Sequence, residues 1–298
     1  MKSKELIKII AAIILMIMFI IILAISYFTW VDIESKATQE IKETCSLETK
    51  QYMGRNIFVI TPKEGATSNI KMLYFHGGAY VAEASKYHWD FIEKLIKDTG
   101  ITVIMPDYPL TPKYNYKDVF EMIVPLYKEI IQKVNAEELI LAGDSAGGGI
   151  SLALLERVKE DNLKMPKKTL LISPWLDVRL KNEKIEQVEK FDKELNKESL
   201  ILAGISYASE DGMNSYLVNP IDGDLKGLEN IAIFTGTYDI LNPDVHALDE
   251  KAKSVGTQIT IKEYDRAGHI WIIKPNTEQE IIDQGYQDFV KEIIDAEK

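Results

Sequence analysis

Cysteine, histidine and basic residues are all scarce in this 298-residue chain, and each shortage excludes a class of protein. The single cysteine, Cys45, rules out an internal disulfide and a cysteine-based zinc cluster. Four histidines leave few ways to build a metal site, and we predict none. The 35 basic and 46 acidic residues give a formal net charge of -11. Such a surface repels phosphate backbones, so nucleic acid is not an expected partner.

The one long apolar run lies at the N-terminus. Seventeen apolar residues run unbroken from Ile9 to Ile25. As a helix, Ile9 to Trp30 would span roughly 33 Å at about 1.5 Å per residue, enough to cross a hydrocarbon core of about 30 Å. Lysines precede the run and acidic residues follow it. By the positive-inside rule, we expect a cytoplasmic N-terminus and an extracytoplasmic catalytic domain.

Residues 1–30 are therefore predicted to be a single-pass membrane anchor. The alternative is a cleaved signal peptide, which would leave a secreted protein. The basic start and the small residues Ala24 and Ser26 favour that alternative. The apolar run is longer than the usual 7 to 15 or so residues of a signal peptide, and this favours the anchor.

Beyond residue 50, short β-branched runs alternate with longer amphipathic stretches. The predicted strands are residues 57–60, 70–75, 102–105, 139–142, 169–173, 231–235 and 258–264. The predicted helices are residues 88–98, 117–134, 146–159, 245–255 and 278–296. This alternation predicts the α/β class, with a mostly parallel central sheet and helices on both faces.

Two segments interrupt this alternation. Residues 179–208 are charged and helix-prone and contain no strand, which predicts a small helical cap inserted between two strands. Residues 31–50 are polar and helix-leaning, and we expect a linker or a segment that packs with the cap. The main domain is predicted to span residues 51–298.

The strongest motif is the pentapeptide Gly143-Asp144-Ser145-Ala146-Gly147, a G-x-S-x-G pattern. It follows the predicted strand 139–142 and opens the predicted helix 146–159, which is the context of a nucleophile elbow. The turn must be sharp, so small residues flank the serine. The Ser145 hydroxyl would stand above the carboxyl end of the strand, near a helix N-terminus that favours developing negative charge.

A second motif, His76-Gly77-Gly78-Ala79, directly follows the predicted strand 70–75. A tetrahedral intermediate needs donors aimed at its oxyanion, and glycines let backbone N–H groups come close to it. We therefore predict an oxyanion hole formed by Gly77, Gly78 and Ala146, the residue after the serine. His76 is expected to hold the loop.

A serine nucleophile needs a base, and the base needs an orienting acid. His269 lies in the loop after the last predicted strand, whereas His88 and His246 lie at the starts of helices. The acid should lie in the loop of the preceding strand, where Asp239 is the first choice and Asp244 the alternative. The chain order Ser…Asp…His fits an α/β-hydrolase and no other well-known serine-hydrolase order.

Six stretches together resemble the hormone-sensitive-lipase-like branch of the α/β-hydrolases, also called the alpha/beta hydrolase fold-3 group of esterases. They cover the chain from about residue 50 to its end. They are Tyr74-Phe75-His76-Gly77-Gly78-Ala79-Tyr80, Asp107-Tyr108-Pro109-Leu110-Thr111-Pro112, Gly143-Asp144-Ser145-Ala146-Gly147-Gly148, Ser173-Pro174-Trp175-Leu176-Asp177, Asp239-Ile240-Leu241 and Gly268-His269. The resemblance implies an α/β-hydrolase fold with a helical cap, a Ser145–Asp239–His269 triad and hydrolysis of carboxylic esters.

The chain departs from the family pattern at two positions. Ala79 stands where many members have a third glycine, but it is not one of the three expected donors. Pro243 stands four residues after Asp239, where an acidic residue is usual. The second departure concerns the surroundings of the acid and not the acid itself.

The predicted function is hydrolysis of a small-molecule carboxylic ester, with no metal or organic cofactor. The short insertion 179–208 favours a modest pocket and short acyl groups. Tyr80, Trp175 and Tyr207 could line this pocket, or they could serve core or cap packing. Three other functions stay open: an amidase or peptidase on the same fold, a deacetylase of cell-surface glycans, and a non-catalytic membrane-tethered binding protein.

Overall fold

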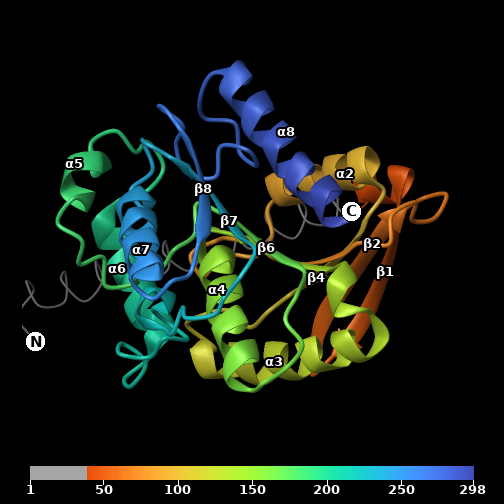
Figure 1. Ribbon diagram of the computed structural model, residues 1–298, viewed down its shortest axis with the longest axis horizontal. Coiled ribbons are helices and arrows are strands. Elements are labelled where there is room, and N and C mark those ends of the chain that lie inside the picture. The colour runs from red at the N-terminus through yellow and green to blue at the C-terminus, as the bar shows by residue number, and fades with distance from the viewer. Residues whose placement is uncertain (1–38) are drawn as a thin grey trace, which may run out of the picture.

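An eight-stranded sheet forms the centre of the computed structural model, which describes residues 39–298 (Figure 1). Across the sheet the strands lie in the order β1-β2-β4-β3-β5-β6-β7-β8. Strands β3 to β8 run parallel to one another. Strand β2 is antiparallel to both of its neighbours, β1 and β4. The strands are β1 (Cys45–Tyr52), β2 (Arg55–Pro62), β3 (Lys71–Phe75), β4 (Thr102–Pro106), β5 (Leu139–Asp144), β6 (Lys168–Ile172), β7 (Ile231–Gly236) and β8 (Ile259–Tyr264).

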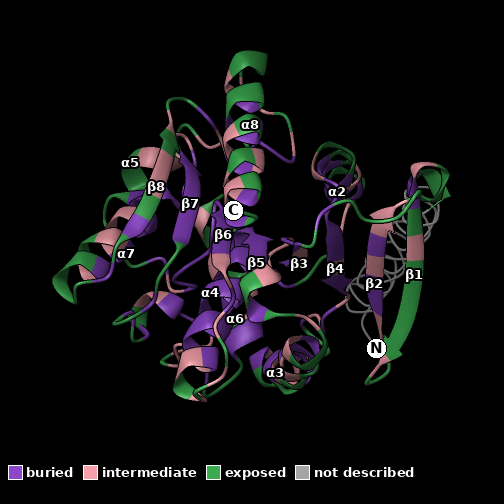
Figure 2. Ribbon diagram, turned by 45° about the vertical axis from the view of Figure 1, so that its right-hand side comes forward, coloured by how far each residue is buried: buried purple, intermediate pink, exposed green. Residues whose placement is uncertain are grey.

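Helices cover both faces of this sheet (Figure 2). Helices α2 (Lys86–Thr99) and α8 (Gln279–Ala296) pack together on one face. Helices α3 (Tyr116–Lys133), α4 (Ser145–Glu160) and α7 (Asn242–Ser254) contribute to the core on the other face. Two short 3-10 helices, η1 (Ala136–Glu138) and η2 (Pro220–Asp222), lie in connecting segments.

The central strands supply side chains to two separate hydrophobic cores. In β5, Leu139 and Leu141 belong to the core beside α3 and α4. Ile140 and Ala142 point the other way, into the core beside α2 and α8. All six residues of β5 are buried. A strand covered on both faces needs apolar residues on both, which is why its sequence reads as a continuous apolar run.

All seven predicted strands and all five predicted helices are present, with ends displaced by at most three residues. The insertion between β6 and β7 contains the helices α5 (Ile185–Glu189) and α6 (Lys197–Ala208). The prediction of a mostly parallel sheet with helices on both faces is confirmed.

Strand β1 corrects the prediction for residues 31–50. Instead of a linker, Cys45–Tyr52 is an edge strand of the sheet, and residues 39–44 are helical. A turn at Met53 and Gly54, where the φ of Gly54 is 77°, joins β1 to β2. An edge strand keeps most of its side chains in solvent, so β1 carries polar residues and no apolar run that would distinguish it from a linker.

The predicted localisation also requires correction. Within residues 39–298, no helix combines the length and the apolar character that crossing a bilayer demands. The predicted anchor, Ile9 to Trp30, lies outside the described residues. The prediction of a single-pass membrane protein with an extracytoplasmic catalytic domain is therefore wrong for the part of the chain that the structure describes.

The turn from β5 into α4 brings two backbone segments into close contact. Asp144 ends the strand and Ser145 begins the helix, with a left-handed φ of 52° at Ser145. A Cβ atom on Gly147 would lie 2.0 Å from the carbonyl oxygen of Phe75. A Cβ atom on Gly143 would lie 2.4 Å from the carbonyl oxygen of Gly147. Only glycine allows β3 and the first turn of α4 to approach this closely.

We expect Gly147→Ala to lower the free energy of unfolding by about 3 kcal/mol or more, because the new methyl group would overlap backbone atoms of β3. Gly227→Ala is the matched control, since Gly227 has a φ of 76° but open space around it. Its cost should be about 1 kcal/mol, from the left-handed backbone alone. Urea denaturation of both variants measures the difference, and equal losses would contradict the steric explanation.

Candidate active site

Ser145, His269 and Asp239 form one hydrogen-bonded chain. His269 Nε2 lies 2.9 Å from Ser145 Oγ, and His269 Nδ1 lies 3.0 Å from Asp239 Oδ2. The three residues are 6%, 4% and 0% exposed, in the order Ser145, His269, Asp239. Hydrogen bonds among such buried groups are shielded from competition with water. The structure thus brings together the three residues that the sequence predicted to act together.

Each of the three follows a different parallel strand. Ser145 stands at the end of β5, Asp239 lies in the loop after β7, and His269 lies in the loop after β8. The carboxyl ends of parallel strands meet at one edge of the sheet, which is where open α/β sheets place their sites. The second oxygen of Asp239, Oδ1, accepts a hydrogen bond from the Leu241 N–H at 2.9 Å, which fixes the carboxylate.

Opposing effects act on the pKa of His269. Burial lowers this pKa, but the charge of Asp239 and the hydrogen bond from Nδ1 raise it and outweigh burial. The pKa of His269 therefore lies above its ordinary value of 6.5. Because the Asp239 carboxylate accepts from Nδ1, the neutral ring presents Nε2 as an acceptor toward the Ser145 hydroxyl.

The remaining candidates take other partners. His88 Nε2 lies 3.3 Å from Asp144 Oδ2, and His246 Nε2 lies 2.7 Å from Glu263 Oε1. Asp244, the alternative acid, sits at the start of α7, where burial raises the pKa of its carboxyl to about 7. His269 is paired with Asp239 and not with Asp244.

The loop after β3 holds the predicted oxyanion donors in an arrangement that differs from the expected one. The Gly77 N–H donates to Asp144 Oδ1 at 3.0 Å, so this donor is already occupied. Ala146 is the second residue of α4, and its N–H is one of the helix-start groups without an intrahelical acceptor. Within residues 39–298, no hydrogen bond engages the N–H of Gly78 or of Ala79.

His76 and Asp144 hold this loop in place. His76 Nδ1 lies 2.7 Å from the Gly77 carbonyl oxygen, and its ring stacks on Tyr108 with centroids 4.6 Å apart. Burial lowers the pKa of His76 to about 4, so the ring is neutral. Asp144 accepts from the Tyr74 hydroxyl at 2.6 Å as well as from Gly77. Both residues are therefore structural in this geometry.

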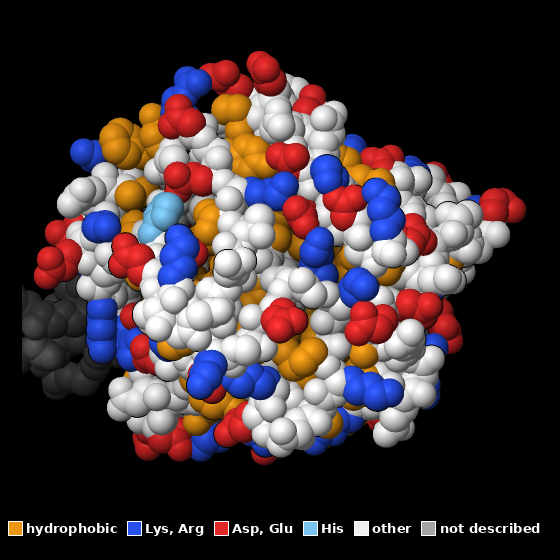
Figure 3. Space-filling view, viewed as in Figure 1, with side chains coloured by type: hydrophobic (Ala, Val, Ile, Leu, Met, Phe, Trp, Pro, Cys, Tyr) orange, Lys and Arg blue, Asp and Glu red, His pale blue; other side chains and the backbone are white. Residues whose placement is uncertain are grey.

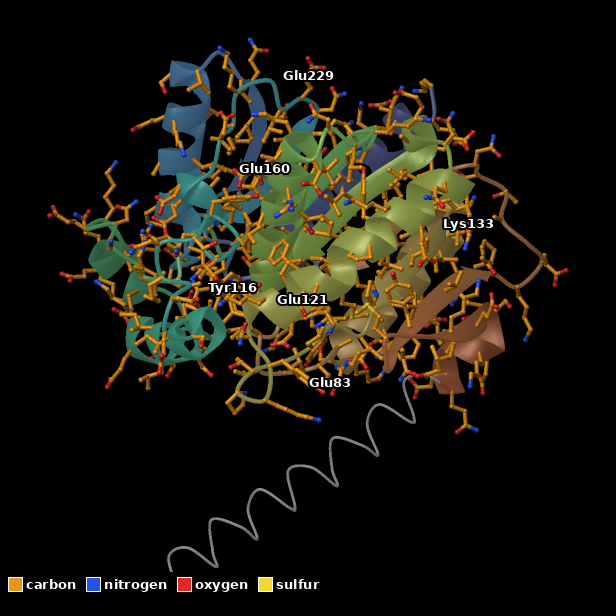
Figure 4. The ribbon with its side chains drawn as sticks, turned by 90° about the horizontal axis from the view of Figure 1, so that it is seen from below. Glu83, Tyr116, Glu121, Lys133, Glu160 and Glu229 are labelled. Carbon is orange, nitrogen blue, oxygen red and sulfur yellow. The ribbon has the colours of Figure 1, made fainter. Side chains whose placement is uncertain are left out.

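Tyr80, Trp175 and Tyr207 come together as one buried aromatic cluster. The rings of Tyr80 and Tyr207 stack with centroids 3.6 Å apart, and the rings of Tyr80 and Trp175 stack with centroids 5.3 Å apart. The backbone N–H of Trp175 donates to the Ser145 carbonyl oxygen at 2.9 Å, which links the residue at one end of the cluster to Ser145. Tyr116, labelled in Figure 4, lies at the start of α3. Its ring meets that of Tyr207 edge-on, with centroids 6.4 Å apart.

Several residues that support the site were not predicted. Ser173 Oγ accepts from the Ile270 N–H at 3.1 Å, and Asn276 donates to the His269 carbonyl oxygen at 2.7 Å. Asp192, in the insertion, accepts from the Ile240 N–H next to Asp239 at 2.9 Å. Ser173 lies in the stretch Ser173–Asp177 that the resemblance singled out. The contacts of Asn276 and Asp192 depend on how distant segments pack, and no sequence motif marks them.

Charged groups of both signs are mixed on the face of the molecule that Figure 3 shows. The described residues on the face seen in Figure 3 form no continuous basic patch of the sort that binds nucleic acid. In the part of the chain from residue 39 onward, no group of three or more histidine, cysteine or acidic residues is arranged to hold a metal ion.

Comparison with known proteins gives the same picture. A family model described as alpha/beta hydrolase fold matches residues 72–273. An esterase of Acinetobacter venetianus is 31% identical over 205 residues, which cover 68% of this chain and 67% of that protein. An acetyl-hydrolase of Streptomyces hygroscopicus is 27% identical over 201 residues, covering 67% of each chain.

A solved structure, an esterase from the bacterial hormone-sensitive lipase family, superposes with a TM-score of 0.77. It is 25% identical in sequence, and the match covers 85% of this chain and 84% of that one. The family model spans more than half of the sequence and includes the elbow, both glycines of the loop after β3 and His269. This chain belongs to the α/β-hydrolase fold family, in its hormone-sensitive-lipase-like branch.

Proposed function

We propose that this chain hydrolyses carboxylic esters, with Ser145 as the nucleophile, His269 as the general base and Asp239 as the orienting acid. The observation that carries the proposal is the position of His269, with one ring nitrogen 2.9 Å from Ser145 Oγ and the other 3.0 Å from Asp239. The relatives named esterase and acetyl-hydrolase support ester hydrolysis as the reaction class.

In the proposed acylation step, His269 Nε2 removes the Ser145 proton while Oγ attacks the ester carbonyl. Asp239 holds the imidazole in the tautomer that exposes Nε2 and stabilises the imidazolium that forms. The imidazolium then gives its proton to the leaving alcohol. Water, activated by the same nitrogen, releases the acid from Ser145. In this proposal the side chains of Ser145 and His269 supply the nucleophile, the base and the route for the proton.

The oxyanion that forms during attack needs backbone donors. The Gly77 N–H is bound to Asp144, so we assign the oxyanion hole to the N–H groups of Gly78 and Ala146. The Ala79 N–H is the third donor, because within residues 39–298 it has no hydrogen-bond acceptor. The N-terminus of α4 adds a favourable partial positive charge. Loss of one such donor typically costs about 3 kcal/mol of transition-state stabilisation.

The substrate class that we propose is an ester with a short acyl group. Tyr80, Trp175 and Tyr207 stack on one another and are almost completely buried. The backbone of Trp175 is hydrogen-bonded to that of Ser145. The helix α6 carries Tyr207, so the insertion with α5 and α6 would act as the cap over the acyl pocket. Its Ser206 hydroxyl is hydrogen-bonded to Thr111, which fastens α6 to the segment after β4. The acetyl-hydrolase relative also supports a short acyl group.

Replacing Ser145 by alanine should reduce the hydrolysis of p-nitrophenyl acetate by roughly 10⁴-fold or more, because the attacking oxygen is lost. Labelling by a fluorophosphonate should disappear with it. Ser151→Ala is the matched control: Ser151 is also buried in α4, but its hydroxyl bonds to the carbonyl oxygens of Ala142 and Gly147. This control should keep both activities. Undiminished hydrolysis by Ser145→Ala would contradict the assignment of the nucleophile.

The pH dependence of kcat/KM should follow His269. Activity requires the neutral ring, so kcat/KM should fall as the pH drops through the pKa of His269, which Asp239 raises above 6.5. Removing that charge in Asp239→Asn lets burial dominate and moves this acid limb to lower pH, while kcat falls by roughly 10⁴-fold. Kinetics from about pH 5 to pH 9 measure both effects.

Asp244→Asn is the matched control for this series, because Asp244 follows the same strand but is not bonded to His269. Its acid limb should coincide with that of the wild type. If Asp244→Asn moved the limb and Asp239→Asn did not, the roles of the two acids would be reversed.

Tyr207→Ala should shift the substrate preference toward longer acyl chains, because it removes the buried ring that stacks on Tyr80. The measurement is kcat/KM on p-nitrophenyl esters from acetate to dodecanoate. Ile205→Ala serves as the control, since Ile205 lies on the same helix and is 50% exposed. An unchanged preference in Tyr207→Ala would exclude this cluster as the limit on acyl length.

A further inference from the structure

One turn of the insertion contacts the loops of both the acid and the base. Asp192 begins this turn, and its Oδ2 accepts from the Ile240 N–H at 2.9 Å. Ile240 directly follows Asp239 in the chain. The other oxygen of Asp192, Oδ1, accepts from the N–H groups of Glu194 and Leu195 at 2.9 Å each. The carboxylate is thus held by its own segment on one side and holds the loop of the acid on the other.

Glu194, two residues later, reaches the loop of the base. Its Oε1 accepts from Asn276 Nδ2 at 3.0 Å, and the same amide nitrogen lies 2.7 Å from the His269 carbonyl oxygen. Its Oε2 accepts from Lys274 at 2.8 Å. The turn from Asp192 to Glu194 therefore braces both loops that bring His269 and Asp239 together.

Asp192 also adds charge next to the proposed triad. Burial raises the pKa of Asp192, and the charge of Asp239 raises it further. For His269, the negative charge of Asp192 adds to those of Asp239 and Asp144 in favouring the imidazolium. The carboxylates of Asp239 and Asp192 therefore both favour the protonated form of the His269 ring.

The other charged groups on this side are largely paired with one another. A cavity of about 410 Å³ lies against His269, Asp192 and Tyr238, and Lys193, Arg266 and Glu278 also line it. Arg266 lies 3.0 Å from Glu278, and Glu194 lies 2.8 Å from Lys274. Within residues 39–298, Asp192 is instead hydrogen-bonded to backbone N–H groups, and no bonded cation cancels its charge.

We propose that Asp192 is a positioning residue of the active site, which fixes the loop of Asp239 and supplies a second negative charge beside His269. This role rests on the proposed function of the triad. The insertion thus brings an acid to the loop of Asp239 from a distant part of the chain. In this proposal the active site is complete only when the insertion packs against the loops of Asp239 and His269.

The test compares Asp192→Asn, Asp192→Ala and the control Glu189→Gln in the full-length protein. Asparagine keeps the shape of the side chain and removes its charge, whereas alanine removes the acceptor as well. Glu189 lies in the same insertion and accepts the Lys197 N–H at 2.7 Å, without a bond to either loop. The readouts are the pH profile of kcat/KM on p-nitrophenyl acetate and the pH dependence of fluorophosphonate labelling, with thermal unfolding as the check on folding.

We expect Asp192→Asn to move the acid limb of both profiles to lower pH by roughly half a unit, since the charge contributes less than the directly bonded Asp239. Asp192→Ala should show the same shift and also lower kcat by roughly tenfold at the plateau, with KM little changed, because the loop of Asp239 loses its brace. Glu189→Gln should match the wild type in every readout.

Two results would overturn the role of Asp192. One is that both Asp192 variants keep the wild-type kcat and lose kcat/KM at the same low pH as the wild type. The other is that Glu189→Gln changes kcat and the pH profile as much as the Asp192 variants do. The effect would then come from a general loss of packing of the insertion. A folded wild-type protein that neither hydrolyses the ester nor reacts with the fluorophosphonate would instead overturn the proposed function itself. Wild-type labelling combined with unshifted Asp192 variants would overturn only the positioning role.

Discussion

The close backbone contact between the end of β3 and the first turn of α4 is the constraint on which the rest of the site depends. Gly147 packs so tightly on the Phe75 carbonyl that no side chain fits between them. This contact sets Ser145 in a left-handed conformation at the end of β5. It also places Asp144 where it binds the Gly77 N–H, so the loop after β3, which holds the proposed oxyanion donors, is fastened to the turn at Ser145.

A second constraint is electrostatic. A buried histidine ordinarily becomes harder to protonate, because the protein interior solvates the imidazolium poorly. Around His269, three carboxylates oppose that cost: Asp239 by direct contact, then Asp192 and Asp144. They come from a strand-end loop, from the insertion and from the elbow, respectively. The balance between burial and charge is therefore a property of the packed molecule, and it holds the pKa of His269 above its ordinary value.

Much of this architecture could be predicted from the sequence, and the exceptions have physical reasons. Strands buried on both faces require continuous apolar runs, so β5 and its neighbours were recognisable. The exposed edge strand β1 had no such run and read as a linker. The bond from Gly77 to Asp144 was not predicted, because a glycine motif indicates which N–H groups can approach a ligand but not which one is already occupied. The predicted membrane anchor, residues 1–30, lies outside the described residues.

The sequence by itself determined the alternation of strands and helices, the elbow around Ser145 and the chain order that pairs it with Asp239 and His269, because these depend on local periodicity, turn chemistry and order along the chain. The tertiary structure alone decided that the Gly77 N–H is bound to Asp144, how the aromatic rings of the cluster stack, and that Asp192 meets the loop of Asp239. These depend on contacts between segments far apart in the chain, such as the 48 residues that separate Asp192 from Ile240. Burial and distance, which set the energies of such contacts, exist only after the chain has packed.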